Sequence, residues 1–446
     1  MTETAKKPKP IRCDPRWRAA DPALGAAVAR LADLLEAQEH SRARRRRSGD
    51  AATFRLAVEA IACNLLALST AAPDRPLAIP LANAASQATP IFGKVARKVI
   101  DLMLKLGLVI KTRGYPYVGP STIEPTPEMR KHLPLGTIAW GALRLDDDPQ
   151  VVVVLRKATR DDDDDDDAKP APPRRLTRHQ RQWLRKVTAE MHAINAAIRG
   201  APVECDASAA FHVDERPRKP PASLVTAQHR SLRRYFNGTW EQGGRLFGGF
   251  WQTMGRTDRF RHIRIGDEPV ALVDYGQLFL RLAYAKAGVK PPPGDLYDVT
   301  GSDACGAEWK RLREARKKLV NALFFRTALL TQWPGARPDE RFEMRDAFPP
   351  GTTPRAAIKA IKQKHAPIAD WFERGHGLHF MRTEGDLIVA VTMALFAQGI
   401  AALPIHDAVL VPERHAATAK AVMERAARRL TGAAIPAAIE TAADHQ

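Results

Sequence analysis

Two aspartates, Asp274 and Asp407, each stand at the end of a short apolar run. Residues 269–273 read Pro-Val-Ala-Leu-Val before the first, and residues 400–405 read Ile-Ala-Ala-Leu-Pro-Ile before His406 and the second. Runs of this length predict buried strands, which would deliver both carboxylates to one edge of a sheet. Two carboxylates brought together in this way can hold a pair of divalent cations, the arrangement that drives in-line phosphoryl and nucleotidyl transfer.

The charge balance favours a polyanionic partner. The chain has 446 residues, with 69 Lys and Arg against 50 Asp and Glu, and a formal net charge of +19. Residues 161–167 supply seven of the acids, so the remainder is more basic than the total. Such a chain is long enough for two or three cores. Nucleic acid is the expected partner, and a soluble basic protein without one is the alternative.

Cysteine spacing and hydropathy indicate the compartment. The cysteines lie far apart, at Cys13, Cys63, Cys205 and Cys305, which disfavours a disulfide framework and a structural zinc site. We expect reduced thiols in a cytoplasmic protein. The N-terminus lacks the apolar segment of a signal peptide. No uncharged apolar stretch approaches the roughly 20 residues that span a membrane, and residues 387–405 are expected to be a buried helix followed by a strand.

Composition divides the chain into four parts. Residues 1–50, with their arginine run at 42–47, are expected to form a basic, disordered arm that binds phosphates or stays solvated. Residues 51–145 are expected to form a helical DNA-binding domain. Residues 146–173 are expected to form an acidic, proline-containing linker, which leaves residues 174–446 for the catalytic domain.

The second part has the element order of winged-helix proteins. Apolar residues recur at three- and four-residue steps from residue 54 to residue 68, and a second helix over 95–106 stops at Gly107. A strand and a basic turn follow. This order resembles the recognition helix and wing of winged-helix proteins, whose cations face DNA. The matching residues are Lys94, Arg97, Lys98, Lys105, Lys111 and Arg113. A helical module with a hairpin and no DNA role is the alternative.

Two further segments combine arginines with aromatic residues. Residues 174–200 predict a basic helix in which Trp183 lies among arginines, and residues 232–252 intersperse glycines and aromatic residues with Arg245. Glycine lets the backbone approach a ligand closely, and aromatic rings can stack on bases. Arg245 is therefore expected to contact DNA. A tight loop packed with aromatic residues is the alternative.

Three motifs follow one another in the order found in family A DNA polymerases. Asp-Tyr-Gly-Gln-Leu-Phe-Leu-Arg, starting at Asp274, resembles motif A, whose usual form is Asp-Tyr-Ser-Gln-x-Glu-x-Arg. Ile-His-Asp-Ala-Val-Leu-Val, starting at Ile405, resembles motif C, which related single-subunit phage-type RNA polymerases share. Between them, residues 313–325 are similar to motif B, the fingers helix. The resemblance covers roughly residues 230–430 and makes three motif matches in order.

The resemblance implies an α+β fold: a polymerase-type palm with an antiparallel sheet and helical fingers, preceded by a small winged-helix-like domain. It implies that Asp274, Tyr275 and Asp407 hold two Mg²⁺ ions, which Mn²⁺ can replace, and that both aspartates are catalytic. One metal would lower the pKa of the primer 3′-hydroxyl and the other would stabilise the leaving pyrophosphate. His406 would contact the primer terminus. The nucleotide would be bound by Arg313, Lys317, Asn321, Phe325, Phe279 and Gln277.

Several positions depart from the family pattern. Phe279 stands where glutamate is usual, and its ring would block a ribose 2′-hydroxyl sterically, which favours deoxynucleotides. Asn321 stands where family A DNA polymerases carry an aromatic residue, and Ala408 replaces an acidic or hydroxyl residue. With two strong metal ligands remaining, Glu384 and Asp386 are candidates to assist, and a surface or capping role is the favoured alternative for both.

The motifs predict template-directed nucleotidyl transfer by a DNA-directed DNA polymerase. Its partners would be primer–template DNA and deoxynucleoside triphosphates, with no membrane involved. One alternative is a non-catalytic DNA-binding replication initiator or regulator whose palm site has decayed. The other is an RNA polymerase or primase.

Overall fold

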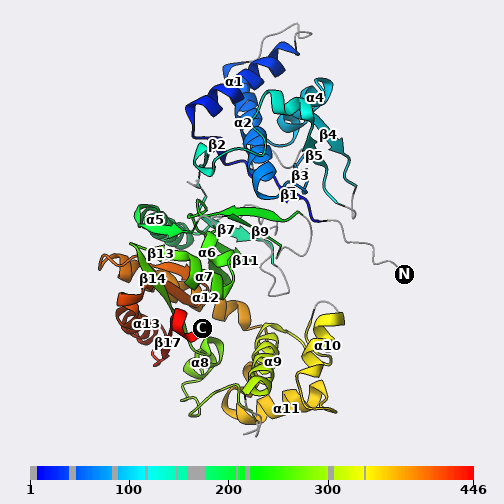
Figure 1. Ribbon diagram of the computed structural model, residues 1–446. Helices are drawn as coiled ribbons and strands as arrows, with labels where there is room; N and C mark the ends of the chain where they lie inside the picture. Colours follow the sequence, from blue (N-terminus) through cyan, green and yellow to red (C-terminus); the bar gives the residue numbers. More distant parts are fainter. Residues whose placement is uncertain are drawn as a thin grey trace. The chain divides into compact units, whose positions relative to one another are not determined.

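The computed structural model divides the chain into two compact units (Figure 1). Unit 1 comprises Met1–Asp148 and Cys205–Arg230, and unit 2 comprises Pro149–Glu204 and Ser231–Gln446. The structure describes residues 8–39, 47–82, 89–115, 119–146, 149, 151–158, 176–206, 209, 211–215, 221–299, 306–335 and 338–445. The acidic run at 161–167 and the arginines within 42–46 lie outside the described residues.

In the described part of unit 1, three α-helices pack against a small sheet. The helices are α1 (Pro22–Ala37), α2 (Ser48–Ala71) and α4 (Lys94–Lys105). The sheet has the order β1-β3-β5-β4, formed by β1 (Ile11–Arg12), β3 (Leu77–Ala78), β5 (Thr122–Pro125) and β4 (Val109–Thr112). Two further strand pairs complete it: β2 (Trp17–Ala19) with β6 (Leu143–Leu145), and β9 (Phe211–Asp214) with β10 (Ser223–Thr226).

Helix α2 is the central helix of unit 1. The apolar face predicted from residue 54 to residue 68 is buried in the core. By length and composition, α2 is the one described helix that could cross a membrane, and 67% of its most apolar window is buried inside the protein. The apolar length of α2 is therefore accounted for by the core of unit 1.

Residues 8–39 are ordered, so the prediction of a disordered arm over residues 1–50 is wrong for this stretch. The Asp21 carboxylate caps α1 by accepting from Leu24 N at 2.8 Å, and Pro22 occupies the first turn. The buried face of α1 comprises Leu24, Val28, Leu31, Ala32 and Leu35. This apolar spacing, rather than the charge of the segment, decides its structure.

Unit 1 also includes Cys205–Arg230, a segment that follows the first part of unit 2 in the sequence. Ile11 pairs with Ala222 in a parallel bridge, and His229 Nε2 lies 3.4 Å from Asp14 Oδ2. Arg16 donates to the same carboxylate at 3.0 and 2.7 Å. A domain ending at residue 145 therefore omits part of its own core.

Unit 2 is built on two sheets. The larger has six strands in the order β15-β16-β14-β13-β8, with β17 also paired to β14. These are β8 (Val203–Cys205), β13 (Ile263–Ile265), β14 (Glu268–Tyr275), β15 (Leu403–Ile405), β16 (Ala408–Pro412) and β17 (Ala437–Glu440). The smaller sheet has the order β12-β11-β7, formed by β12 (Gly243–Phe247), β11 (Arg233–Asn237) and β7 (Val153–Arg156). The predicted linker thus contains a strand, β7.

Helices cover both sheets and make unit 2 an α+β structure. They are α5 (Arg178–Gly200), α6 (Phe250–Thr253), α7 (Arg256–His262), α8 (Leu278–Lys286), α9 (Gly306–Phe325), α10 (Pro338–Asp346), α11 (Pro354–Lys364), α12 (Gly377–Phe396) and α13 (Ala416–Thr431). Helix α13 packs on β14, β16 and β17, while α12 packs on α13 and β12. Figure 1 shows α9, α10 and α11 grouped together. The larger sheet pairs β14 antiparallel with β13, β16 and β17, as predicted.

A glycine pair sets the distance between α12 and β12. A Cβ placed on Gly385 would lie 2.1 Å from the carbonyl oxygen of Gly244, so only glycine permits this approach. The neighbouring residues Glu384 and Arg245 consequently meet across the same contact.

Candidate active site

The two aspartates of the sequence motifs lie at the same edge of the larger sheet. Asp274 is the penultimate residue of β14 and is paired with Ala408, the first residue of β16. Asp407 lies in the two-residue turn between β15 and β16, and its carbonyl accepts from Tyr275 N at 3.2 Å. The two apolar runs thus form β14 and β15, which flank β16 in the sheet and both pair antiparallel with it.

The turn that carries Asp407 has an unusual backbone. His406 has φ of 49°, a left-handed conformation that is uncommon for residues other than glycine. Its ring lies 5.5 Å from the ring of Phe247, centroid to centroid, at an interplanar angle of 63°. Uncommon backbone conformations of this kind cluster at functional sites.

Burial and mutual repulsion oppose ionisation of the pair. Burial, together with the Asp407 carboxylate, raises the pKa of Asp274 to about 8. Burial likewise raises the pKa of Asp407, against the opposing influence of Arg245. Lys317 and Arg256 favour the charged form of both carboxyls. The nearby cations therefore only partly offset the cost of ionising the two carboxyls.

The pair fits a hard divalent cation. Asp274 Oδ1 is buried and accepts no hydrogen bond from any described residue. Across the described part of the chain, no group of three or more His, Cys, Asp or Glu side chains could hold a metal ion. Mg²⁺ is commonly held by one or two carboxylates, with water and substrate phosphates completing its coordination. A buried carboxylate oxygen without a hydrogen bond from the described residues, next to a second carboxylate, suits that ion.

Helix α9 contains all four residues of the predicted fingers motif. Lys317 is exposed and close enough to influence both aspartates. Arg313 lies one turn earlier, where its Nε donates to the Asp295 carboxylate in a short ion pair. Asn321 and Phe325 are half-buried. The Phe325 ring packs so closely on Gly377 that a Cβ added to this glycine would lie within 2.7 Å of the ring.

The motif A residues after Asp274 are largely packed. Phe279 is 7% exposed, with its ring 6.0 Å from Phe325 and 5.8 Å from Phe380. The Tyr275 hydroxyl donates to the Met423 carbonyl at 2.6 Å, so this side chain ties β14 to α13 and is not directed at a metal. Any ligand atom from this residue would have to come from the backbone.

Gln277, also expected to bind nucleotide, instead joins two side chains of the protein. Its Nε2 donates to Asp295 Oδ1 at 2.5 Å, and its Oε1 accepts from Arg281 Nη2 at 3.2 Å. Gln277 adopts a left-handed backbone conformation, with φ of 58°, immediately before α8. The side chain therefore fixes the turn that follows Asp274.

The acids considered as auxiliary metal ligands are paired with arginines. Glu384 accepts from Arg245 Nε at 2.7 Å and from Nη2 at 2.9 Å. Asp386 accepts from Arg234 Nη2 at 2.7 Å and forms a short ion pair with Arg382. The favoured surface or capping role is wrong for Glu384, which is 1% exposed, whereas the Asp386 side chain remains 40% exposed.

Two residues near the aspartates gave no signal in the sequence. Arg256, at the start of α7, favours the charged form of both carboxyls and pairs with Glu440 of β17 at 2.5 Å. Tyr297 is buried, and its pKa is raised by burial and by Asp407. Arg313 places its guanidinium 5.3 Å from the centre of the Tyr297 ring. Only the tertiary fold reveals these neighbours.

The cations predicted to face DNA from unit 1 lie on α4 and the adjoining strand β4. Lys94, Lys105 and Arg113 are exposed, whereas Arg97, Lys98 and Lys111 are half-buried. Lys98 Nζ lies 3.3 Å from Glu39 Oε1. The Arg113 guanidinium lies 5.5 Å from the centre of the Tyr115 ring.

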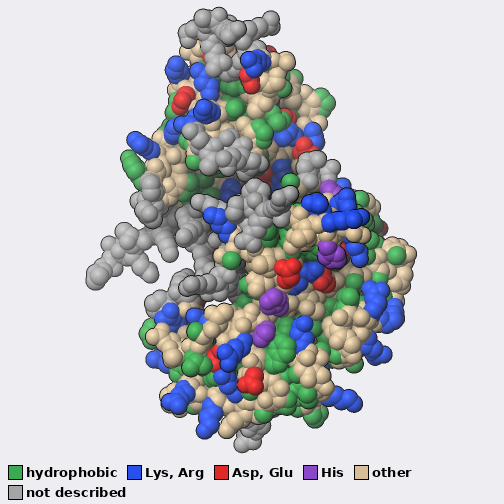
Figure 2. Space-filling view, turned by 180° about the vertical axis from the view of Figure 1, so that it is seen from behind, with side chains coloured by type: hydrophobic (Ala, Val, Ile, Leu, Met, Phe, Trp, Pro, Cys, Tyr) green, Lys and Arg blue, Asp and Glu red, His purple; other side chains and the backbone are tan. Residues whose placement is uncertain are grey.

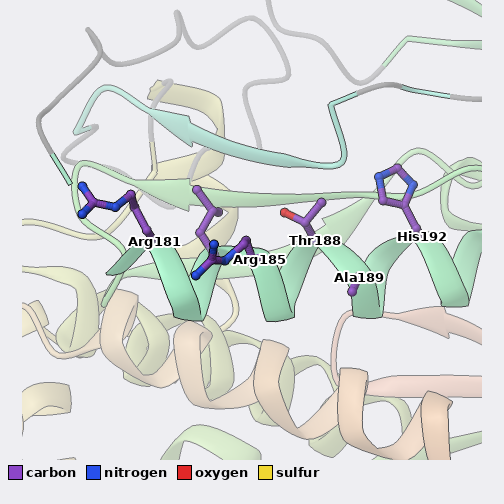
Figure 3. A pocket seen from close by; sticks show the side chains of 6 residues that line it. Arg181, Arg185, Thr188, Ala189 and His192 are labelled. Atoms are coloured by element: carbon purple, nitrogen blue, oxygen red, sulfur yellow. The ribbon is translucent and has the colours of Figure 1, made fainter. Parts of the chain in front are cut away.

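A basic groove runs along the predicted arginine-rich helix of unit 2. It has a volume of about 520 Å³ and is lined by Arg181, Leu184, Arg185, Thr188, Ala189 and His192, all on α5. Arg181, Thr188 and His192 extend from the same side of the helix (Figure 3). On the face shown in Figure 2, Lys and Arg side chains of unit 2 are spread more widely than Asp and Glu side chains.

The segment expected to stack on bases is largely a packed hairpin. Residues 233–247 form β11 and β12, and the Phe236 ring lies 5.3 Å from Trp240 and 5.4 Å from Trp183. Trp251 Nε1 donates to the Pro404 carbonyl at 2.9 Å, which joins this region to β15. These aromatic side chains stabilise the fold, in agreement with the alternative interpretation.

Comparison with known proteins gives distant likenesses to solved structures. No family model matches the chain, and no curated protein matches it. A solved structure, the POL domain of Pol1 from M. smegmatis in complex with DNA primer-template and dNTP, is similar with a TM-score of 0.30 and 11% sequence identity. The match covers 48% of this chain and 48% of that chain, so this chain spans about half the length of that structure.

Proposed function

We propose that unit 2 is a template-directed nucleotidyltransferase, a DNA-directed DNA polymerase that uses deoxynucleoside triphosphates. The observation that carries the proposal is the pair of carboxylates, Asp274 and Asp407, at the ends of adjacent strands beside an exposed lysine, Lys317. A buried pair of acids is costly unless a cation balances it. Its presence at one sheet edge therefore supports a metal-dependent reaction.

Asp274 and Asp407 would hold two Mg²⁺ ions. Such ions, when bound, activate the attacking hydroxyl and stabilise the pyrophosphate leaving group. The carboxyls must be ionised to bind metal, and the raised pKa of Asp274 means that binding releases a proton. Lys317 and Arg313 project from α9 and would bind the triphosphate, whose charge they complement.

The sugar and base would lie against the aromatic residues beside the aspartates. Phe279 packs between Phe325 and the guanidinium of Arg245, which lies 5.9 Å from the centre of the Phe279 ring. A rigid aromatic edge at this position excludes a 2′-hydroxyl by steric overlap, which favours deoxynucleotides. His406 would contact the primer terminus from the turn next to Asp407.

DNA would be held by cations of both units. In unit 1, α2, β3, α4, β4 and β5 follow one another in winged-helix order, with β5 between β3 and β4 in the sheet. Helix α4 would then be the recognition helix and the β4–β5 connection the wing. In unit 2, Arg181 and Arg185 in the groove on α5 suit a phosphate backbone.

Incorporation of single nucleotides tests the proposal. Full-length protein is incubated with a labelled primer–template, Mg²⁺ and one deoxynucleoside triphosphate at a time. The expected result is addition of the nucleotide complementary to the next template base, and of no other. Binding to the primer–template without incorporation of any nucleotide, in Mg²⁺ or Mn²⁺, would instead favour a non-catalytic DNA-binding protein.

A further inference from the structure

The Asp295 carboxylate joins the turn after Asp274 to helix α9. Its Oδ1 accepts from Gln277 Nε2 at 2.5 Å and from Tyr297 N at 2.9 Å. Its Oδ2 accepts from Arg313 Nε in a short ion pair. Gln277 immediately precedes α8, and Arg313 lies near the middle of α9. One carboxylate therefore connects two elements on which the proposed nucleotide site depends.

The ion pair fixes the direction of the Arg313 guanidinium. Asp295 binds it through Nε, and its plane lies over the Tyr297 ring with 5.3 Å between the guanidinium carbon and the ring centre. Among the described residues, Nη1 contacts the exposed Glu314 at 3.5 Å. Because the guanidinium is a rigid planar fork, anchoring at Nε fixes its plane and leaves the edge formed by its two terminal nitrogens facing away from Asp295. Those nitrogens are suited to a bidentate contact with phosphate oxygens.

The backbone around Asp295 is held independently of its carboxylate. Lys364 Nζ donates to the Asp295 carbonyl at 2.9 Å and to the Asp298 carbonyl through a second, short bond. His365 Nε2 lies 2.9 Å from the Leu296 carbonyl. Burial lowers the pKa of His365 to about 4, so the ring is neutral at neutral pH. Replacing the Asp295 carboxylate should therefore leave the loop in place.

We infer that Asp295 is a positioning residue that aims Arg313 at the triphosphate of the incoming nucleotide. The inference rests on the proposed function, in which Arg313 binds that triphosphate. Gln277 links this arrangement to the turn that follows Asp274, so the anion site and the metal site share one support. Asp295 acts on substrate binding through Arg313, so its loss should raise the nucleotide KM with little effect on kcat.

The chain supplies a matched control from the same loop. Asp298 Oδ1 lies 3.5 Å from Nη1 of Arg316, which is one turn further along α9. Arg316 is buried, and its guanidinium lies 5.8 Å from the centre of the Trp309 ring. Asp298→Asn thus also removes a loop carboxylate that pairs with an arginine of α9. That arginine, Arg316, lies on the core side of the helix, away from the proposed nucleotide site.

The test compares Asp295→Asn, Asp298→Asn, Arg313→Lys and the Asp295→Asn/Arg313→Lys double variant. Single-nucleotide incorporation and thermal melting are measured for each. Asp295→Asn is expected to raise the nucleotide KM about tenfold, with kcat within about threefold, and Asp298→Asn to leave KM unchanged. Lysine lacks the guanidinium Nε, so Arg313→Lys should raise the nucleotide KM by a similar factor. In the double variant, Asp295→Asn should cause no further rise in KM beyond that of Arg313→Lys.

Three results would overturn the inference: a KM for Asp295→Asn within twofold of wild type, an equal rise for Asp298→Asn, or additive effects in the double variant. If Asp295→Asn fails to fold, a nucleotide KM that does not rise in Arg313→Lys still overturns the inference, because Asp295 acts through Arg313.

Calorimetric binding of Mg²⁺–tripolyphosphate separates this inference from the proposed function. Wild type that binds the anion about tenfold more tightly than Asp295→Asn, yet extends no primer, would sustain the anion site and overturn the polymerase proposal. Equal binding by the two proteins, or none by wild type, would overturn the role of Asp295.

Discussion

Arg245 and Glu384 form a two-point ion pair between β12 and α12, with Nε 2.7 Å from Oε1 and Nη2 2.9 Å from Oε2. The close approach of Gly385 to Gly244 makes the pair possible. The Arg245 cation favours the ionised form of Asp407 and so lowers a pKa that burial raises. Glu384 thereby influences the site through Arg245 and not as a metal ligand.

Replacing Glu384 should destabilise the protein without weakening metal binding. Glu384→Ala removes the carboxylate that binds the Arg245 guanidinium in a mostly buried setting, which typically costs about 3–5 kcal/mol. Glu384→Gln keeps a hydrogen-bond acceptor and should cost less. Thermal melting measures the loss of stability, and Mn²⁺ titration of Glu384→Gln measures the affinity for metal. A tenfold or greater loss of Mn²⁺ affinity would instead make Glu384 a ligand.

The pKa of Asp274 predicts a stability that falls with rising pH in metal-free buffer. Its folded pKa of about 8 lies above the ordinary value of 3.8, so the folded protein binds more protons between these limits. Stability from this group is therefore present below pH 4 and is lost as pH rises towards 8. Asp274→Asn should melt roughly 2–6 °C above wild type at pH 8, which corresponds to about 1–2 kcal/mol, and similarly to wild type at pH 4.

The exposed Asp370 provides the control for this measurement. Asp370→Asn should melt like wild type at both pH values. Adding Mg²⁺ at pH 8 should raise the melting temperature of wild type and leave that of Asp274→Asn unchanged, because ligand binding to the folded state stabilises it. A wild-type melting temperature that stays constant from pH 4 to pH 8 would contradict the raised pKa of Asp274.

Phe279→Ala should admit ribonucleotides. Removing the ring opens the space that a 2′-hydroxyl would occupy, so the ratio of deoxynucleotide to ribonucleotide incorporation should fall by about tenfold or more. The substitution also removes a core side chain, at a typical cost of about 3–5 kcal/mol. Phe324→Ala is the control, since Phe324 packs on Phe372 and Phe380 instead of Phe279. Unchanged sugar discrimination in Phe279→Ala would remove this residue from the sugar site.

DNA binding by unit 1 should depend on salt through its exposed cations. Lys94→Ala and Arg113→Ala should each reduce the slope of log affinity against log salt by about 0.9 for duplex DNA. Lys98→Ala should have a smaller effect, because Glu39 already partners Lys98. Fluorescence anisotropy at several salt concentrations measures the slopes. Arg30→Ala, an exposed change on α1, is the charge-matched control, and an equal loss there would indicate bulk charge alone.

The sequence was informative where local pattern determines structure. The apolar runs before Asp274 and His406 do form strands, and the four-residue spacing from Arg313 does lie on one helix. The helix and strand expected over residues 387–405 correspond to α12 and β15. Each of these signals lies within one short stretch of chain.

The remaining features depend on contacts between distant segments. Glu384 meets Arg245 from 139 positions away, and Arg256 meets Glu440 from 184 positions away. No periodicity links such pairs, because their meeting depends on how α12 and β17 pack. Composition also misjudged residues 8–39, where the charge of the segment drew attention from the apolar spacing of α1.

Primer extension by aspartate variants tests the central claim most directly. Wild type, Asp274→Asn, Asp407→Asn and the control Asp370→Asn are given primer–template DNA, Mg²⁺ and all four deoxynucleoside triphosphates, and DNA binding is measured in parallel. The account predicts extension by wild type and Asp370→Asn, loss of at least about 10³-fold in Asp274→Asn and Asp407→Asn, and DNA affinity preserved in all four. Extension by either site variant at the wild-type rate, or no extension by wild type despite tight DNA binding, would contradict it.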